Sequence, residues 1–201
     1  MSQPKVKEIT AYPPSYWSIK APAGGIQVTP VDEYLNYKVT NVQLSNTWTL
    51  VSVLNRLSTK AGAFIIFRIR VNTVENTSEA KLSLSPLGES GDHGPPPRGV
   101  ILRYSSGSFN YEWYDTGNNF QQLSASNIRD DGAWHTIVLG LTPKSVTLVE
   151  NGSYKFTWNV NVPGTVNPTF DMQILDFGGS LDIDIGSVYA IPATVDDSTD
   201  D

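Results

Sequence analysis

The chain has 201 residues, with 20 acidic and 14 basic side chains, a formal net charge of −6 and no cysteine. The lack of cysteine excludes a disulfide framework, a thiolate nucleophile and a cysteine-ligated zinc site. The acidic balance argues against nucleic acid or an anionic membrane surface as a partner, because both are bound by clustered Lys and Arg. Chains of this length routinely form a single all-β unit that buries a core of its own.

The composition along the chain sets the expected domain limits. We expect a flexible lead-in over residues 1–10, one sandwich domain over residues 11–192 and an acidic flexible tail over residues 193–201, because both end segments lack an apolar pattern. No apolar run approaches the ~20 residues of a membrane span. Residues 1–10 also lack the apolar centre of a signal peptide. We therefore expect a soluble domain without membrane insertion, as one part of a larger protein.

Residues 12–26 are rich in proline and aromatic side chains. The prolines exclude a regular helix. The rings of Tyr12, Tyr16 and Trp17 need a surface against which to pack. The segment is therefore predicted to cross over one face of a sheet.

Five segments rich in β-branched and aromatic residues follow at the regular spacing of an all-β domain. They are residues 35–42, 48–54, 63–71, 80–85 and 100–104. In the third segment Phe64, Ile66 and Arg68 share one face and the opposite face is wholly apolar, so we expect a strand covered on both sides. Residues 87–99 are rich in Gly and Pro and predict a long loop, which on a sandwich often carries function; disorder is the alternative.

A hairpin is predicted over residues 103–119, with a polar turn before its return strand. Because side chains alternate along a strand, Phe109, Tyr111 and Trp113 share one face and Tyr114 lies on the other. Only one of the last two rings is therefore expected to be free for a ligand.

A three-stranded antiparallel meander is predicted over residues 130–158. A polar turn precedes a run of aromatic and β-branched residues, a Pro-containing turn reverses the chain, and Asn151-Gly152 reverses it again as a type I′ turn. Residues 134–141 are apolar on both faces, which favours a strand covered on both sides. The side chains expected to be largely buried are Phe67, Trp134, Ile137, Leu139, Val146 and Leu148.

The motif Asp131-Gly132-Ala133-Trp134-His135, followed by a strand and the turn Glu150-Asn151-Gly152, resembles laminin G-like and concanavalin A-like sandwich domains. The resemblance extends over residues 64–191 and includes a closing strand at residues 185–189. It implies an all-β fold, an antiparallel β-sandwich of the jelly-roll type found in concanavalin, galectin and laminin G-like domains. Such sandwiches serve as lectins, glycanases, adhesion modules and viral heads.

Two segments of the chain resemble the rotavirus spike head, the glycan-binding domain at the tip of the outer-capsid spike. They are Tyr12-Pro13-Pro14-Ser15-Tyr16-Trp17 with Ala21-Pro22, and Val188-Tyr189-Ala190-Ile191-Pro192. The resemblance implies a lectin-like attachment domain on the virion surface that binds host-cell glycans. The alternative is a laminin G-like adhesion or carbohydrate-binding module of a bacterial or phage surface protein, extracellular or on the cell surface.

The same resemblance bears on the charge of the ligand. In some rotavirus heads an arginine just ahead of a Tyr-Thr-Leu strand contacts the carboxylate of sialic acid, and the matching position here, before Trp48, holds Asn46. An amide cannot supply the charged fork that a carboxylate favours. We therefore expect neutral cell-surface glycans to bind better than sialylated ones.

Catalytic chemistry has little support in the sequence. Asp182 and Asp184 fall on one strand face about 7 Å apart, a spacing that could serve glycoside hydrolysis. Concanavalin-like glycanases carry Glu at both ends of such a strand, whereas Ser180 and Gly186 stand here. His135 is expected to serve the fold, and no nucleophile elbow, phosphate loop or His-rich metal motif is present. We expect no enzyme, no cofactor and no metal, with a glycoside hydrolase as the third alternative and a loop calcium site left open.

The predicted glycan site lies on the hairpin and the long loop beside it. Sugars offer apolar C–H faces that stack on aromatic rings, and hydroxyls that bind amides, carboxylates and arginine. Aromatic residues beside polar turns are therefore the best candidates, with Tyr114 as the main stacking ring; cross-strand aromatic pairing is the alternative for each. The candidates are His93, Arg98, Arg103, Tyr104, Trp113, Tyr114, Asp115, Asn118 and Asn119.

Overall fold

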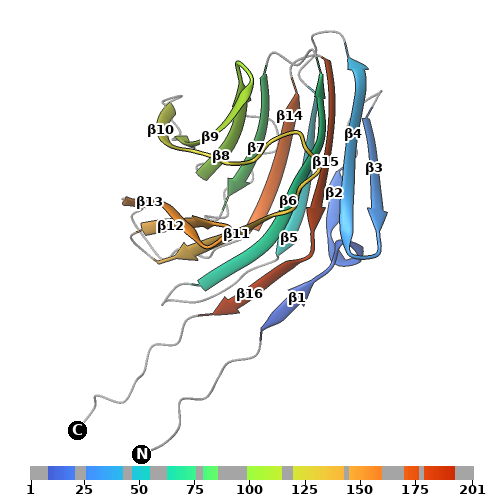
Figure 1. Ribbon diagram of the computed structural model, residues 1–201. Helices are drawn as coiled ribbons and strands as arrows, with labels where there is room; N and C mark the ends of the chain where they lie inside the picture. Colours follow the sequence, from blue (N-terminus) through green and yellow to red (C-terminus); the bar gives the residue numbers. More distant parts are fainter. Residues whose placement is uncertain are drawn as a thin grey trace, which may run out of the picture.

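Two packed antiparallel β-sheets form the computed structural model (Figure 1). It describes residues 9–20, 26–42, 47–54, 63–75, 79–85, 99–114, 120–142, 145–159, 170–176 and 179–192. The nine-stranded sheet is called sheet A and the seven-stranded sheet is called sheet B. This architecture confirms the predicted antiparallel β-sandwich.

Neighbours in sheet A are far apart in the chain. Its strand order is β13 (Ser153–Asn159), β12 (Ser145–Glu150), β11 (His135–Leu141), β6 (Ala63–Glu75), β15 (Gly179–Gly186), β4 (Tyr34–Val42) and β3 (Ile26–Val31). Off this path, β16 (Val188–Pro192) pairs with β6, and β1 (Thr10–Tyr12) pairs with β16. The order of sheet B is β10 (Phe120–Ala125), β9 (Ser108–Tyr114), β8 (Gly99–Ser105), β7 (Glu79–Ser85), β14 (Phe170–Asp176), β5 (Thr47–Leu54) and β2 (Ser18–Lys20).

Strand β6 is the central element of sheet A. One edge pairs with β11 between Ala63 and Ile69, and the other edge pairs first with β16 and then with β15. The chain passes from β15 to β16 at Ser187, whose backbone N–H and Oγ donate to the Glu33 carbonyl at 3.0 and 3.2 Å. The single strand predicted at residues 185–189 is therefore wrong, because Ser187 turns its N–H to Glu33 and leaves the ladder.

The core lies between the two sheets and is built from the inward row of each strand. On β6 this row is Ile65, Phe67, Ile69 and Val71, all buried. Sheet B contributes Leu82, Val100, Leu102, Phe109, Tyr111 and Trp113 to the same cluster. Burial of this apolar surface is the main stabilising contribution to such a fold. Of the predicted core residues, Phe67, Ile137, Leu139, Val146 and Leu148 are confirmed as buried.

The outer face of sheet A, which points away from sheet B, is more exposed to solvent than predicted. Phe64 is 50 % exposed and Arg68 is exposed, and the outward residues of β11 are partly exposed. The two-sided cover expected for residues 63–71 and 134–141 is therefore wrong. Trp134, expected in the core, precedes β11 and is only half-buried on this outer face.

The segment from Thr10 to Lys20 joins the two sheets. It adds β1 to the edge of sheet A and β2 to the edge of sheet B, with a short 3-10 helix, η1 (Pro14–Tyr16), between them. Trp17 follows the helix and is buried, and its Nε1 donates to the Tyr12 carbonyl at 2.9 Å. The expected crossing over one face is therefore replaced by a passage between sheets, because the prolines lack the N–H groups of a continuous ladder.

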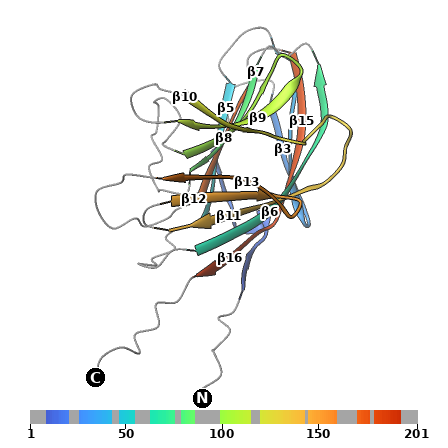
Figure 2. The same ribbon diagram turned by 60° about the vertical axis from the view of Figure 1, so that its left-hand side comes forward.

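At another edge of the sandwich a side chain links the two sheets. Strand β13 of sheet A lies near β10 of sheet B (Figure 2), and Lys155 Nζ on β13 donates to the Ala125 carbonyl on β10 at 3.2 Å. Within the described ranges, no helix is long and apolar enough to cross a membrane.

Candidate functional site

Three neighbouring strands of sheet A carry polar side chains on the outer face. Because β4 and β15 turn their apolar residues inward, the alternate positions face out. Register places Asn36 opposite Asp184, and Lys38 opposite Asp182. Arg70 on β6 lies opposite Asp184 from the other side. The outer polar cluster consists of Asn36, Lys38, Arg70, Asn72, Asp182 and Asp184.

Two amides bridge the two carboxylates of this cluster. Asn36 Nδ2 donates to Asp182 Oδ1 at 2.9 Å and to Asp184 Oδ1 at 2.7 Å. Asn72 Nδ2, one strand away, donates to Asp182 Oδ1 at 3.0 Å and to Asp184 Oδ2 at 2.9 Å. One amide group holds two N–H donors, so each can serve both acids. The pair is thereby held by protein groups on either side.

The two carboxylates differ in their cations and in their exposure. Arg70 Nε lies 2.6 Å from Asp184 Oδ2, and the Asp184 side chain is only 2 % exposed. Lys38 Nζ lies 3.2 Å from Asp182 Oδ2, where the aspartate side chain is 17 % exposed and the lysine side chain 49 %. Asp184 is therefore the internal anchor of the cluster, and Asp182 with Lys38 is the part that solvent or a ligand can reach.

The surroundings of Asp182 keep it ionised. Burial alone would raise the pKa of Asp182, but hydrogen bonds from Asn72 and Asn36 and the ammonium of Lys38 outweigh burial and hold the pKa below its ordinary value. At neutral pH this carboxylate accepts hydrogen bonds and has no proton to donate.

Beside the polar cluster, arginine side chains pack on aromatic rings. The Arg68 guanidinium lies 5.0 Å from the centre of the Trp134 ring, and that of Arg70 lies 4.7 Å from it. Arg70 is also 5.4 Å from the Tyr34 ring, which meets Trp134 edge-on at 6.0 Å. Gly132, with a φ of 71°, donates its N–H to the Val71 carbonyl at 3.0 Å and so fixes the approach of Trp134 to β6.

Exposed apolar rings adjoin this arginine pair along β6. Phe64 is 50 % exposed and Tyr189 is 42 % exposed. Tyr189 lies opposite Ile66 in the β16–β6 pair, and both are on the outer face. Phe64, Ile66 and Tyr189 form the apolar strip. The outer-face site comprises the outer polar cluster, the apolar strip, Arg68 and Trp134. Hydrogen-bonding groups and stacking rings therefore lie at two positions of one surface, with Arg68 and Arg70 of β6 between them.

The predicted hairpin site is described only in part. Arg103 Nη1 lies 3.2 Å from Glu112 Oε1, across the β8–β9 pair. Tyr104 packs on Phe109 with ring centres 5.0 Å apart, and buried Trp113 packs on Trp158 at 6.0 Å. For Tyr104 and Trp113 the structure thus shows the aromatic packing that was the alternative to sugar stacking. The side chain of Tyr114, and the residues His93, Arg98, Asp115, Asn118 and Asn119, lie outside the described residues.

His135 is buried in the fold, where it meets Glu150. Its Nδ1 lies 3.1 Å from Glu150 Oε1. The fully buried Glu150 carboxylate also accepts hydrogen bonds from Tyr111 Oη, Ser126 Oγ and the backbone N–H of Asn127. Tyr111 belongs to sheet B and Glu150 to sheet A, so this carboxylate joins the sheets. Burial, and next the charge of Glu150, raise the pKa of the Tyr111 phenol well above its ordinary value.

A metal site is not seen in this part of the protein. Among the described residues no group of three or more His, Asp or Glu side chains is arranged to hold a metal ion. Asp182 and Asp184 are instead surrounded by amide and cationic donors. A cation would have to compete with Lys38 and Arg70 for the same oxygens.

The sandwich is similar to solved carbohydrate-binding structures, although no protein-family model and no curated protein matches the chain. The Emp46p carbohydrate recognition domain is 13 % identical, with 92 % of this chain and 97 % of that chain covered and a TM-score of 0.66. The VIP36 exoplasmic/lumenal domain, solved with Ca²⁺ and Man3GlcNAc, is 10 % identical, with 96 % of this chain and 93 % of that chain covered and a TM-score of 0.66. A structure from work on endo-acting O-glycanases of the human gut microbiota is 10 % identical, with 94 % of this chain and 100 % of that chain covered and a TM-score of 0.67. Identities this low show the fold alone.

Proposed function

We propose that this chain is a glycan-binding domain without catalytic activity, and that the sugar binds at the outer-face site. The observation that carries the proposal is that the exposed rings Phe64 and Tyr189 and the partly exposed Asp182 and Lys38 lie on one outer face. Tyr189 pairs with Ile66 and Asp182 pairs with Thr73, seven residues or roughly 23 Å apart along β6, so an oligosaccharide is needed to span both groups. A sugar needs both an apolar stacking surface and hydrogen-bonding partners for its hydroxyls. The similarity to carbohydrate recognition domains of Emp46p and VIP36 supports this choice of ligand.

The polar half of the site is suited to binding because it is already ordered. The bridging amides Asn36 and Asn72 hold Asp182 from two strands. A preorganised group loses little conformational entropy when a ligand arrives. The Lys38 ammonium supplies donors, and the Asp182 carboxylate supplies an acceptor, for the hydroxyls of a sugar unit that lies over β15 and β4.

The same contacts favour binding over hydrolysis. A glycosidase needs one carboxyl group whose pKa is raised, so that it can protonate the leaving oxygen. The pKa of Asp182 is instead lowered. Asp184 is nearly inaccessible and paired with Arg70. The flanking positions hold Ser180 and Gly186, which supply no further acid.

The place of the domain in a larger protein is part of the proposal. The resemblance of residues 12–17 and 188–192 to the rotavirus spike head supports a viral attachment domain on the virion surface. Strands β1 and β16, which overlap these segments, pair with Thr10 opposite Ala190, so both lie together at one end of the sandwich (Figure 1). This placement suits a head carried on one stalk. A module of another extracellular surface protein is the alternative.

The preference for neutral over sialylated glycans stays a prediction of the sequence. It depends on Asn46, which lies outside the described residues. Asn46 precedes β5 in the chain, and β5 belongs to sheet B, whereas the outer-face site belongs to sheet A.

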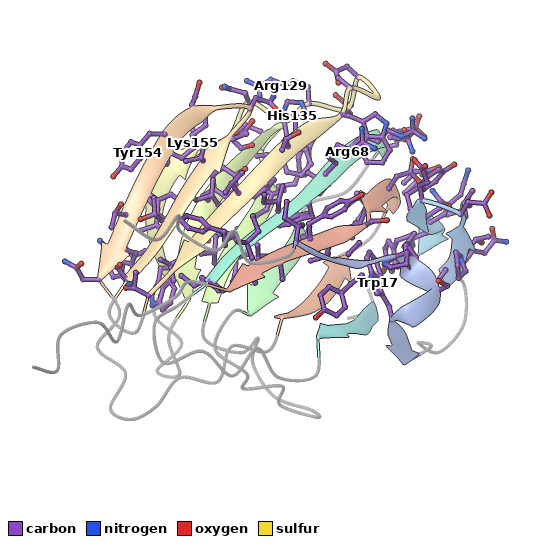
Figure 3. The ribbon with its side chains drawn as sticks, turned by 90° about the horizontal axis from the view of Figure 1, so that it is seen from below. Trp17, Arg68, Arg129, His135, Tyr154 and Lys155 are labelled. Carbon is purple, nitrogen blue, oxygen red and sulfur yellow. The ribbon has the colours of Figure 1, made fainter. Side chains whose placement is uncertain are left out.

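Binding to a glycan array, followed by titration with the best ligands, tests the proposal. Tyr189→Ala should weaken binding by a factor of about 10 or more, as expected for an aromatic hot spot. Tyr154→Ala is the matched control, because Tyr154 is 65 % exposed and lies far from Arg68 in sheet A (Figure 3). Equal loss in both variants, or none in Tyr189→Ala with folding intact, would place the sugar elsewhere.

A further inference from the structure

We propose that the bound glycan carries an acidic group, a carboxylate or a sulfate, and that the guanidinium of Arg68 binds it. This inference rests on the proposed function and names the ligand class of the same site. It is opposite to the preference for neutral glycans that was predicted from Asn46. The two predictions rest on different residues: Arg68 belongs to β6 of sheet A, and Asn46 precedes β5 of sheet B in the chain.

Arg68 differs from the other cations of the outer face in its partners. Lys38 is paired with Asp182, and Arg70 is paired with Asp184. Within the described part of the chain, Arg68 is exposed and has no carboxylate within ion-pair distance. Its recorded contact there is the packing of its guanidinium on Trp134. The charge of Arg68 is therefore available to a ligand.

Arg68 is held in one place although its end is exposed. The guanidinium lies 5.0 Å from the Trp134 ring centre. A Cβ at Gly186 would lie 3.4 Å from the Arg68 Cβ, which is ordinary van der Waals contact, so β15 flanks the base of the arginine side chain. Stacking occupies the π face of a guanidinium. The N–H groups in its plane stay able to donate two parallel hydrogen bonds to a carboxylate or a sulfate.

The neighbours of Arg68 complete a subsite for an acidic sugar. Thr136 lies directly opposite Arg68 in the β11–β6 pair and is partly exposed, so its hydroxyl can serve a sugar oxygen. On the other side Tyr189 pairs with Ile66, two residues from Arg68 along β6. Such diagonal neighbours are about 7–8 Å apart, within reach of large side chains. One sugar ring can therefore stack on Tyr189 while its acidic group meets Arg68.

The charge near Arg68 differs from that of the whole protein. The chain carries a net charge of −6, which disfavours acidic ligands in general. The outer face has three cations, Lys38, Arg68 and Arg70, and three carboxylates, Asp182, Asp184 and Glu75. Because Asp182 and Asp184 are paired with Lys38 and Arg70, the attraction for an acidic group is confined to the surroundings of Arg68. The resulting selectivity should weaken as salt is added.

The test compares glycans that differ only in the acidic group. The pairs are sialylated and unsialylated lactose, a glucuronate-terminated chain and its glucose counterpart, and a sulfated galactoside and its unsulfated form. For at least one pair the acidic member should bind about 10-fold or more tightly, the gain expected of a charged two-point hydrogen bond. The pair that shows the gain identifies the group as carboxylate or sulfate.

Variants at Arg68 assign the gain to this residue. Arg68→Gln should abolish the difference within the pair, so that the acidic member binds no more tightly than the neutral member. Arg68→Lys should keep only a part of it, because an ammonium lacks the planar fork. Arg129→Gln is the control, since Arg129 is also exposed and contacts only backbone carbonyls among the described residues. Melting temperatures of all variants check that Trp134 remains packed.

The outcomes separate this inference from the proposed function. Equal affinity for acidic and neutral members, with binding still lost in Tyr189→Ala, would overturn the acidic ligand and leave the glycan site standing. An acidic preference that survives in Arg68→Gln would also overturn it. Absence of binding to every glycan would overturn both.

Discussion

Arg70 and Asp184 face each other across the β6–β15 pair, with Arg70 Nε 2.6 Å from Asp184 Oδ2. The two side chains are 28 % and 2 % exposed, so the loss of either partner has unequal consequences. Arg70→Gln leaves a buried carboxylate without its cation and should cost about 3 kcal/mol of unfolding free energy. Asp184→Asn leaves a partly exposed guanidinium that water can reach, and should cost less.

Urea unfolding of both variants measures this asymmetry. Lys38→Gln is the matched control, because the Lys38–Asp182 pair is half open to solvent and should contribute less than about 1 kcal/mol. A larger loss for Asp184→Asn than for Arg70→Gln would contradict the account of Asp184 as the internal anchor.

Leu139 tests whether β11 is a core strand. Its side chain is fully buried between the sheets, so Leu139→Ala should lower the free energy of unfolding by about 2–5 kcal/mol. Val138→Ala, on the partly exposed outer face of the same strand, should cost less than about 1.5 kcal/mol. Equal and small losses in the two variants, measured by urea unfolding, would mean that the strand is not central.

Much of the fold follows from alternation along single strands. The faces predicted for Phe109, Tyr111 and Trp113 are confirmed, because all three rings are buried together. The same rule placed Trp134 on the face opposite Ile137, and its aromatic character then gave the wrong expectation of burial. Trp134 instead lies half-buried on that outer face, where the guanidinium groups of Arg68 and Arg70 pack on its ring and no further sheet covers it in the described part of the chain.

The candidate site was harder to predict, because its residues come from distant parts of the chain. Alternation shows that Asn36 and Lys38 share a face, as do Arg68 and Arg70, and as do Asp182 and Asp184. It does not show that β15 inserts between β6 and β4, since period-two patterns carry no information on partner strands. The signal that the sequence did offer is Arg68 and Arg70, which alternate with the apolar residues Phe67, Ile69 and Val71 and so indicate that one face of this strand is exposed.

Glu150 was also not recognised, for a different reason. It precedes the Asn151-Gly152 turn, and charged residues at turns are normally exposed. Here the carboxylate is fully buried and accepts hydrogen bonds from Tyr111 Oη and Ser126 Oγ. Such a role depends on partners from both sheets and is not visible in a local pattern.

Acid should weaken the protein partly through Asp182. Its folded-state pKa is lowered, so its contribution to stability is present above the ordinary value near 3.8 and is lost as pH falls through the folded pKa. The unfolding free energy of the wild type should therefore fall more steeply below about pH 4 than that of Asp182→Asn. Parallel curves for the two proteins between pH 6 and pH 2 would contradict the lowered pKa.

Alkali should weaken the protein through Tyr111. Burial and the Glu150 charge raise the folded-state pKa of this phenol above the ordinary value of 10.0. Its contribution is therefore complete below about pH 10 and is lost as pH rises further, because the unfolded tyrosine ionises first. Tyr111→Phe should remove this part of the alkaline loss, at a cost of about 1 kcal/mol at neutral pH for the missing hydrogen bond. Unfolding curves at pH 8 and pH 11 give the comparison.

The position of the bound sugar is measured most directly by backbone amide NMR during titration with the strongest glycan ligand. The account predicts shift changes in β6, β15 and β16, centred on Arg68, Asp182 and Tyr189. Changes centred on the hairpin around Tyr114, with those three strands unmoved, would contradict it and return the site to the position predicted from the sequence.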